Sequence, residues 1–195
     1  MVTRRFFLGF LILLALQRIL ELRHSKSNET WMRASGGIEH APGQFKIMKL
    51  LHITWFLAMI GEVYYFKRSF IPRLAGLALL LTAIGQSLRY AAIQALGRRW
   101  SVRILTLPNT PPVKNGIYKY IRHPNYAGVI LEILAVPLLH SAYLTSALWS
   151  TANALLLAIR IRREERALME NTSTLDYPMD VPPFIPALRA EKYRK

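Results

Sequence analysis

Arg122-His123-Pro124-Asn125-Tyr126 stands directly before an apolar run that continues to residue 139, and this stretch decides how the chain folds. Proline is favoured in the first turn of a helix, where its missing N–H group needs no partner, so a helix is predicted to begin at Pro124. A second apolar run covers 142–161, and only His140-Ser141 separates the two runs. The sequence therefore predicts a tight helical hairpin with polar groups at its start.

The composition favours a membrane protein. The chain has 195 residues, of which 52% are hydrophobic, and its mean hydropathy is +0.20. The formal net charge is +15, from 26 Lys and Arg against 11 Asp and Glu. Such a charge suits either nucleic acid or the cytosolic rim of a membrane protein, and the long apolar runs favour the rim. We therefore expect no nucleic-acid partner, and we expect no metal site because cysteines and paired histidines are missing.

Five apolar stretches are long enough to be considered as membrane spans, although the fourth is short or tilted. They cover residues 6–22, 47–66, 73–96, 126–139 and 142–161. The first stretch resembles a signal peptide, but no small-residue cleavage site follows it, so we interpret it as a retained helix. The predicted fold is an all-α integral membrane protein with a single domain, 1–195, and five transmembrane helices.

Lysine and arginine residues set the expected orientation, because they concentrate on the cytosolic side of membranes. With the N-terminus outside, the inner segments are 23–46, 97–122 and the tail after 161, and these carry most of the basic residues. An odd number of spans places loop 97–122 and the tail on the same side. We therefore expect the site to face the cytosol, in a multi-pass membrane protein.

Some charged residues fall inside the predicted spans. A carboxylate within a span costs about 2.5–3.5 kcal/mol on insertion scales, so Glu132 should face the interior of the bundle. Glu62 and Arg89 are similar, and they could pair with each other or with Glu132. For these three residues the structural interpretation is favoured over a catalytic one.

Four further residues allow both an ordinary and a functional interpretation. Arg160 and Glu164 share one helical face, as in a solvated salt bridge, but Arg160 ends an apolar run and needs a partner. His123 stands beside free backbone N–H groups that can hold an anion, or it is an ordinary basic residue at a helix start. Tyr118 is close to the membrane interface, where aromatic residues are common.

The order of these motifs resembles the isoprenylcysteine carboxyl methyltransferases, in their small prokaryotic branch. The resemblance rests on Gly116-Ile117-Tyr118, the 122–126 stretch with Gly128, Arg160, Glu164-Glu165, and a tail with Tyr177 and Val181-Pro182-Pro183-Phe184-Ile185-Pro186. It implies a bound S-adenosylmethionine, held by part 97–195, and Arg160 as the residue that holds the methyl acceptor. By motif, the implied cofactor contacts are Thr110, Pro111, Pro112, Val113, Tyr118, His123, Pro124, Asn125, Tyr126 and Glu164.

The chemistry of these side chains is consistent with that cofactor. The carboxylate of Glu164 suits an ammonium group, the helix start at Pro124 suits a carboxylate, and Tyr118 and Tyr126 offer apolar faces to adenine. Methyl transfer is an in-line displacement, so alignment of the reactants supplies much of the catalysis. A carboxylate acceptor, such as a prenylcysteine, needs no base, and Arg160 would orient it by a bidentate contact.

Other functions remain open at this point. A phenol or enol acceptor, such as a long-chain alkylpyrone or alkylresorcinol, must lose a proton, and Glu132 and His123 are the candidate bases. A phospholipid N-methyltransferase or a sterol-type reductase using NADPH shares a similar C-terminal pattern. A lipid-binding scaffold without catalysis is a further alternative. The small size favours a bacterial or archaeal inner membrane, with a lipophilic acceptor and membrane lipid as the partners.

Overall fold

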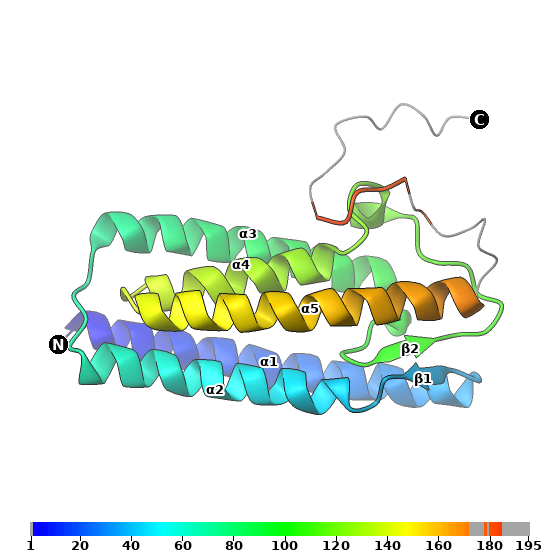
Figure 1. Ribbon diagram of the computed structural model, residues 1–195, viewed down its shortest axis with the longest axis horizontal. Helices are drawn as coiled ribbons and strands as arrows, with labels where there is room; N and C mark the ends of the chain where they lie inside the picture. The colour runs from blue at the N-terminus through cyan, green and yellow to red at the C-terminus, as the bar shows by residue number, and fades with distance from the viewer. Residues whose placement is uncertain (1, 172–177, 179, 185–195) are drawn as a thin grey trace.

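Five helices run along the long axis of the molecule in the computed structural model, which describes residues 2–171, 178 and 180–184 (Figure 1). They are α1 (Val2–Ala34), α2 (Gln44–Tyr65), α3 (Pro72–Leu96), α4 (Pro124–Leu138) and α5 (Tyr143–Asn171). The predicted helix start at Pro124 and the hairpin between the last two helices are confirmed. Tyr177 and residues 185–195 of the predicted tail lie outside the described residues.

Three helices are long and apolar enough to cross a membrane. They cover Gln44–Tyr65, Pro72–Arg99 and Tyr143–Glu170, and α4 is a shorter apolar helix. Helix α1 is longer than predicted, and Arg18 and Glu21 interrupt its apolar run. The prediction of five spans is therefore supported for three helices, and the expectation of an integral membrane protein rests on these three.

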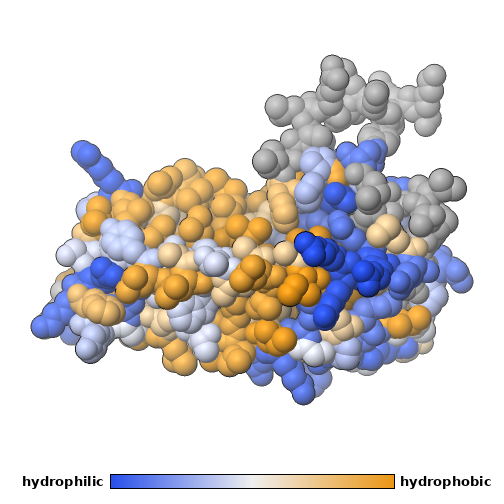
Figure 2. All heavy atoms as spheres, in the orientation of Figure 1, coloured by the Kyte–Doolittle hydropathy of each residue, from blue (hydrophilic) through white to orange (hydrophobic). Residues whose placement is uncertain are grey.

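Hydrophilic side chains gather most densely at one end of the molecule, named here the polar end, while fewer lie at the other end and the middle of the visible surface is largely apolar. Figure 2 shows apolar side chains over the middle of the bundle and hydrophilic side chains gathered at the end on the right. Figure 1 places at this same end the segments before and after the sheet strands, the start of α4 and the C-terminal end of α5. The loop and the end of the last helix therefore meet at one end of the bundle, as predicted.

Helices α3 and α4 approach each other through two glycines. A Cβ atom added to Gly128 would lie 2.5 Å from the backbone oxygen of Gly85 and 2.5 Å from Cγ of Arg89. A Cβ atom added to Gly85 would lie 2.9 Å from the backbone oxygen of Gly128. Small residues allow two membrane helices to approach this closely. Because Gly128 has no side chain, the stem of Arg89 packs directly against α4, and its guanidinium reaches Glu132.

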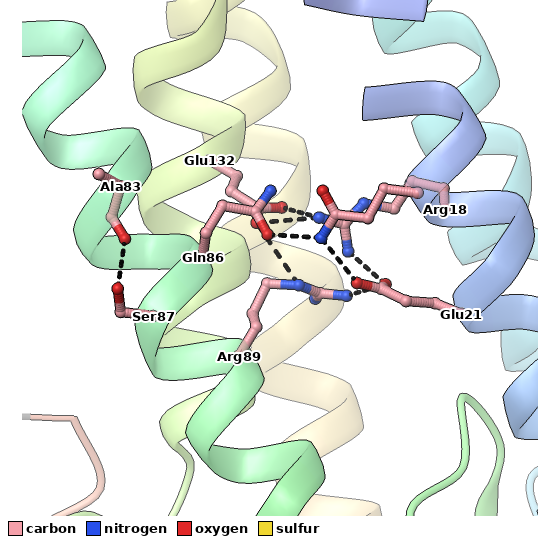
Figure 3. A network of polar contacts seen from close by, with 8 residues as sticks. Arg18, Glu21, Ala83, Gln86, Ser87, Arg89 and Glu132 are labelled. Atoms are coloured by element: carbon pink, nitrogen blue, oxygen red, sulfur yellow. Dashed lines mark hydrogen bonds and ion pairs between the residues drawn. The ribbon is translucent and has the colours of Figure 1, made fainter. Parts of the chain in front are cut away.

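Arg18, Glu21, Arg89 and Glu132 form what we name the buried ion cluster, which joins α1, α3 and α4 (Figure 3). Arg18 Nη2 lies 3.0 Å from Glu132 Oε1, and Arg89 Nη2 lies 2.6 Å from Glu21 Oε2. Arg89 Nε lies 3.4 Å from Glu132 Oε1. The prediction that Glu132 faces the interior and pairs with Arg89 is confirmed.

Glu62 has a different role from the one predicted. Its carboxylate lies 2.8 Å from Nη2 of Arg68, and it accepts hydrogen bonds from the backbone N–H groups of Leu144 (3.1 Å) and Thr145 (2.7 Å). These two groups belong to the first turn of α5, where a negative charge is favourable. Glu62 therefore ties α2 to α5 at the end far from the polar end, and the pairing with Arg89 or Glu132 is not formed.

A small sheet corrects the prediction of helices and loops alone. Strand β1 (Ile38–His40) pairs antiparallel with β2 (Ile104–Thr106), with Ile38 opposite Thr106. The strands are three residues each, too short for a recognisable alternating pattern, and they pair across more than sixty positions of sequence. The loop 97–122 also contains two 3₁₀ turns, Gly97–Arg99 and Gly116–Lys119. This loop is therefore partly ordered against α1 and the β1 strand.

Candidate active site

Two adjoining cavities open at the polar end of the bundle. The smaller, of about 140 Å³, is walled mainly by residues 101–113 and is named here the loop cavity. The larger, of about 420 Å³, is lined by residues of all five helices and is named the helix cavity. Seven residues line both cavities, namely Leu96, Ser101, Arg103, Tyr118, Arg122, His123 and Glu164.

The predicted cofactor contacts divide between the two cavities. Thr110, Pro111, Pro112 and Val113 line the loop cavity alone, whereas Tyr118, His123 and Glu164 line both. Asn125, Tyr126 and Arg160 line the helix cavity alone. Pro124 is buried and lines neither. The structure thus brings most of the set together, with Tyr118, His123 and Glu164 where the cavities meet.

Tyr126 links Arg160 to Glu164. Nε of Arg160 donates a 2.8 Å hydrogen bond to the hydroxyl of Tyr126, and that hydroxyl donates to the carboxylate of Glu164. Arg160 also donates from Nη2 to the backbone oxygen of Val102 at 2.8 Å. Only 6% of Arg160 is exposed, so the residue is not the solvated half of an i, i+4 salt bridge. Its guanidinium is held in one orientation, and the two bonds use two of the five N–H groups that arginine carries.

Glu165 holds the residues that precede α4. Its Oε1 lies 3.0 Å from Nη1 of Arg122 and 3.0 Å from Nε2 of His123. The tail crosses the same two residues, because the N–H groups of Arg122 and His123 donate to the backbone oxygens of Pro182 (3.0 Å) and Pro183 (3.1 Å). The twin glutamates of α5 therefore divide their contacts: Glu164 bonds Tyr126, and Glu165 bonds the start of α4.

Two side chains, Tyr118 at the junction and Asn125 in the helix cavity, carry polar atoms suited to a ligand. Burial raises the pKa of Tyr118, and the nearby carboxylate of Glu164 raises it further, so this phenol stays protonated and can donate a hydrogen bond. The Oδ1 atom of Asn125 is buried and has no hydrogen-bond partner among the described residues. A buried acceptor without a partner is uncommon in proteins and is explained when a ligand or water supplies the donor.

Helix α1 contributes residues to the site that the sequence analysis did not single out. Ser25 Oγ accepts a 2.9 Å hydrogen bond from the N–H of Val102 and donates to Glu29 at 2.7 Å. Nδ2 of Asn28 donates to the backbone oxygen of Trp100 at 2.9 Å. These polar residues recur at helical spacing beyond the apolar run, a signal that they face one common surface. They hold segment 100–103, whose Val102 carbonyl in turn holds Arg160.

Arg103 fixes the loop to the first strand and to α1. Its guanidinium lies 2.6 Å from Glu39 and 3.2 Å from Glu29. The hydrogen bond with Glu39 outweighs burial and raises the pKa of Arg103. Burial acts to raise the pKa of Glu39, but the hydrogen bonds from Arg103 and Arg33 prevail and lower it. Both groups are therefore charged near neutral pH, and Arg103 presents a positive charge to both cavities.

The two cavities together can hold a small molecule that carries a positive and a negative charge next to a lipophilic molecule. Glu164 offers a carboxylate, and Arg103 and Arg122 offer positive charge, at the junction of the cavities. The helix cavity continues between the helices along apolar side chains such as Phe45, Ile53 and Leu157. Glu132 lines neither cavity and is held by Arg18 and Arg89, which does not favour a role as general base.

Comparison with known proteins identifies relatives along most of the chain. The profile of the isoprenylcysteine carboxyl methyltransferase (ICMT) family matches residues 77–170. The uncharacterized protein YpbQ of Bacillus subtilis is 40% identical over 158 residues, covering 81% of this chain and 94% of the relative. An uncharacterized protein of Haemophilus influenzae is 30% identical over 151 residues, covering 76% of this chain and 84% of the relative.

Eukaryotic proteins of known activity are more distant. The protein-S-isoprenylcysteine O-methyltransferase of Schizosaccharomyces pombe is 30% identical over 115 residues, which cover 57% of this chain and 49% of that protein. The solved structure of a eukaryotic intramembrane Ras methyltransferase ICMT is 19% identical with a TM-score of 0.49, over 75% of this chain and 56% of that one. By the family profile over residues 77–170, the chain belongs to the isoprenylcysteine carboxyl methyltransferase family.

Proposed function

We propose that this protein is a membrane-embedded O-methyltransferase that uses S-adenosylmethionine and a lipophilic acceptor such as a prenylcysteine carboxylate. The observation that carries the proposal is the junction of two cavities, one walled by the loop 101–113 and one running between the helices, at Tyr118, His123 and Glu164. Such a junction would let a water-soluble donor meet a greasy acceptor. Family membership supports a methyltransferase activity.

The residues present fit the cofactor. Glu164 suits the ammonium group, and Arg103, Arg122 and the first-turn N–H groups of α4 suit the carboxylate. The unpaired Oδ1 of Asn125 can accept a hydrogen bond from a hydroxyl or amino group. S-adenosylmethionine supplies an electrophilic methyl group when bound, and the side chains around it supply alignment.

Arg160 is the residue that would hold the acceptor. Its guanidinium faces the helix cavity and is fixed by Tyr126 and Val102, with N–H groups left over for a carboxylate. A donor that is already oriented needs no rearrangement when the acceptor binds. The apolar walls of the helix cavity exclude water and contact the lipophilic part of the acceptor.

A phenol or enol acceptor is a second candidate, and the His123–Glu165 pair favours it. A carboxylate accepts, so Nε2 of His123 donates the 3.0 Å hydrogen bond, and this bond orients the ring with Nδ1 away from Glu165. His123 lines both cavities and could remove a proton from a hydroxyl. The two acceptor classes are distinguished by incubating the protein with a prenylated N-acetylcysteine and, separately, with a long-chain alkylresorcinol. Mass spectrometry then shows which of the two compounds gains a methyl group.

Titration with S-adenosylhomocysteine tests the proposal directly. Calorimetry on the detergent-purified protein should show saturable binding, and Glu164→Gln should weaken it about tenfold or more, because a charge-assisted hydrogen bond is lost. Glu170→Gln, on an exposed part of the same helix, is the matched control and should bind normally. Absence of binding by the wild type would defeat the proposal, and binding unchanged in Glu164→Gln would defeat this site assignment.

We further propose that the polar end faces the cytosol, in a bacterial or archaeal inner membrane, because the basic residues gather there. The chain contains no cysteine, so a single introduced cysteine is a unique label. Lys119→Cys, at the polar end, should be blocked only by reagents that cross the membrane. Lys67→Cys, at the opposite end, should be blocked by an impermeant reagent added to whole cells. The reverse pattern would invert the proposed orientation.

A further inference from the structure

The helix cavity is not apolar throughout. Arg18, Glu21, His52 and Arg89, which we name the polar subsite, line its deeper part together with apolar side chains. Three of them belong to the buried ion cluster, whose fourth member, Glu132, lies behind the wall. Charged side chains at this depth are costly and are expected to serve a ligand or a partner.

The polar subsite lies deeper in the bundle than Tyr126 and Arg160. Glu132 follows Tyr126 by six residues on α4, which corresponds to a rise of about 9 Å along the helix. Tyr126 marks the level of Arg160, and Glu132 marks the level of Arg18 and Arg89. A molecule that reaches from Arg160 down the cavity would therefore meet a second set of polar groups about 9 Å further in.

Hydrogen-bonding capacity at the polar subsite is not used up. Nδ1 of His52 bonds the backbone oxygen of Met48 at 2.8 Å, and a carbonyl can only accept, so Nδ1 carries the proton. Nε2 is then an acceptor, and it has no hydrogen-bond partner among the described residues. Nε of Arg89, in contrast, is buried against Glu132 Oε1 at 3.4 Å and is not available to a ligand.

A wholly apolar occupant would leave Nε2 of His52 unpaired. Excluding water from a buried donor or acceptor without replacing its hydrogen bond is unfavourable, and sites built this way reject ligands that lack the matching group. A structural role alone explains the ion pairs between the helices, but it does not explain His52, which belongs to none of those pairs. The polar subsite therefore suits an occupant with a polar group of its own.

We propose that the acceptor of this enzyme carries a second polar group, such as a hydroxyl, on its lipophilic body, and that His52 with Arg18 and Arg89 selects for it. The inference rests on the proposed function, because it takes the helix cavity as the acceptor site. His52 is a specificity-determining residue in this scheme and takes no part in the chemistry. Its Nε2 accepts from the hydroxyl hydrogen, and an arginine N–H donates to the hydroxyl oxygen.

The test compares hexadecanoate with hexadecanoates that carry one hydroxyl at successive chain positions. Binding to the detergent-purified full chain is measured by calorimetry in the presence of S-adenosylhomocysteine. The carboxylate of each probe occupies Arg160, and at one narrow range of positions the hydroxyl should tighten binding about tenfold. A flat series, in which no position binds more tightly than hexadecanoate, overturns the proposal.

Variants separate selection from structure. His52→Phe should remove the preference for the hydroxyl probe while leaving hexadecanoate binding within about twofold, and His52→Gln, which keeps a polar group, should retain part of it. His40→Phe is the matched control outside both cavities and should keep the full preference. A preference that survives in His52→Phe assigns the wrong residue and overturns the proposal.

Binding of S-adenosylhomocysteine distinguishes the two levels of failure. Each variant should bind it as the wild type does, which shows that the fold and the cofactor site are retained. If S-adenosylhomocysteine binds normally but no hydroxylated probe binds more tightly than hexadecanoate, only the proposal for the polar subsite is overturned. Loss of all probe binding by the wild type sinks the acceptor half of the proposed function and this inference with it.

Discussion

Arg160→Met is expected to lower turnover about 10²–10³-fold while leaving the affinity for S-adenosylhomocysteine within about twofold. Methionine keeps much of the volume and the apolar stem of arginine but removes every N–H donor. The acceptor then loses the group that orients it, and such preorganised donors are worth this much in other enzymes. The arginine head reaches Glu164 only through the hydroxyl of Tyr126, which can keep its own hydrogen bond to Glu164, and no residue of the loop cavity wall 104–113 is hydrogen-bonded to it.

Matched variants make this expectation sharp. Arg160→Lys keeps the charge but cannot make two parallel hydrogen bonds, so its turnover should fall between those of the wild type and Arg160→Met. Arg162→Met changes an exposed arginine on the same helix and should leave turnover unchanged. Turnover is measured by mass spectrometry of the methylated acceptor, and binding by calorimetry. If Arg160→Met instead abolished binding of S-adenosylhomocysteine, Arg160 would belong to the cofactor site.

Glu132→Ala is expected to lower the free energy of unfolding by about 3–5 kcal/mol, as measured by chemical denaturation in detergent micelles. Only 4% of Glu132 is exposed, and its carboxylate contacts both Arg18 and Arg89. Removing it leaves the buried Arg89 and the partly buried Arg18 to share the single carboxylate of Glu21. An uncompensated buried charge is the main cost of breaking such a cluster.

Two comparisons identify the source of the loss. The double variant Arg89→Met with Glu132→Met leaves Arg18 paired with Glu21 and should recover much of the stability, because the remaining pair is neutral. Glu39→Ala breaks the more exposed ion pairs of the sheet and should cost about 1 kcal/mol or less. Equal losses in Glu132→Ala and Glu39→Ala would show that the buried ion cluster contributes little.

The same residue tests the general-base alternative. Glu132→Gln removes the charge but keeps the shape of the side chain, so its effect on turnover can be measured in any protein that still folds. A base would be needed only for a phenol or enol acceptor. We expect Glu132→Gln to change turnover no more than its loss of stability explains, because the side chain lines neither cavity. A folded variant with no turnover would restore Glu132 as the base.

Local sequence chemistry predicted the elements and the end at which they meet. Pro124, a residue favoured in the first turn of a helix, predicts where α4 begins, and the two-residue break at His140-Ser141 between apolar runs predicts the hairpin. Charge counting placed loop 97–122 and the end of α5 at one end, where His123 and Glu165 are indeed bonded. It did not predict the sheet, because two strands of three residues carry no periodic signal of their own.

The sequence by itself determined the helices, the polar end and the set of residues that carry the family motif, because these depend on hydrophobic periodicity, proline geometry and charge along neighbouring positions. The tertiary structure alone decided the partners: Tyr126 between Arg160 and Glu164, Arg18 and Glu21 beside Arg89 and Glu132, and Ser25 and Asn28 beneath the loop. Each of these contacts joins side chains from different helices or loops. Which of them meet depends on how closely the helices pack, as at Gly85 and Gly128, and no local pattern records that distance.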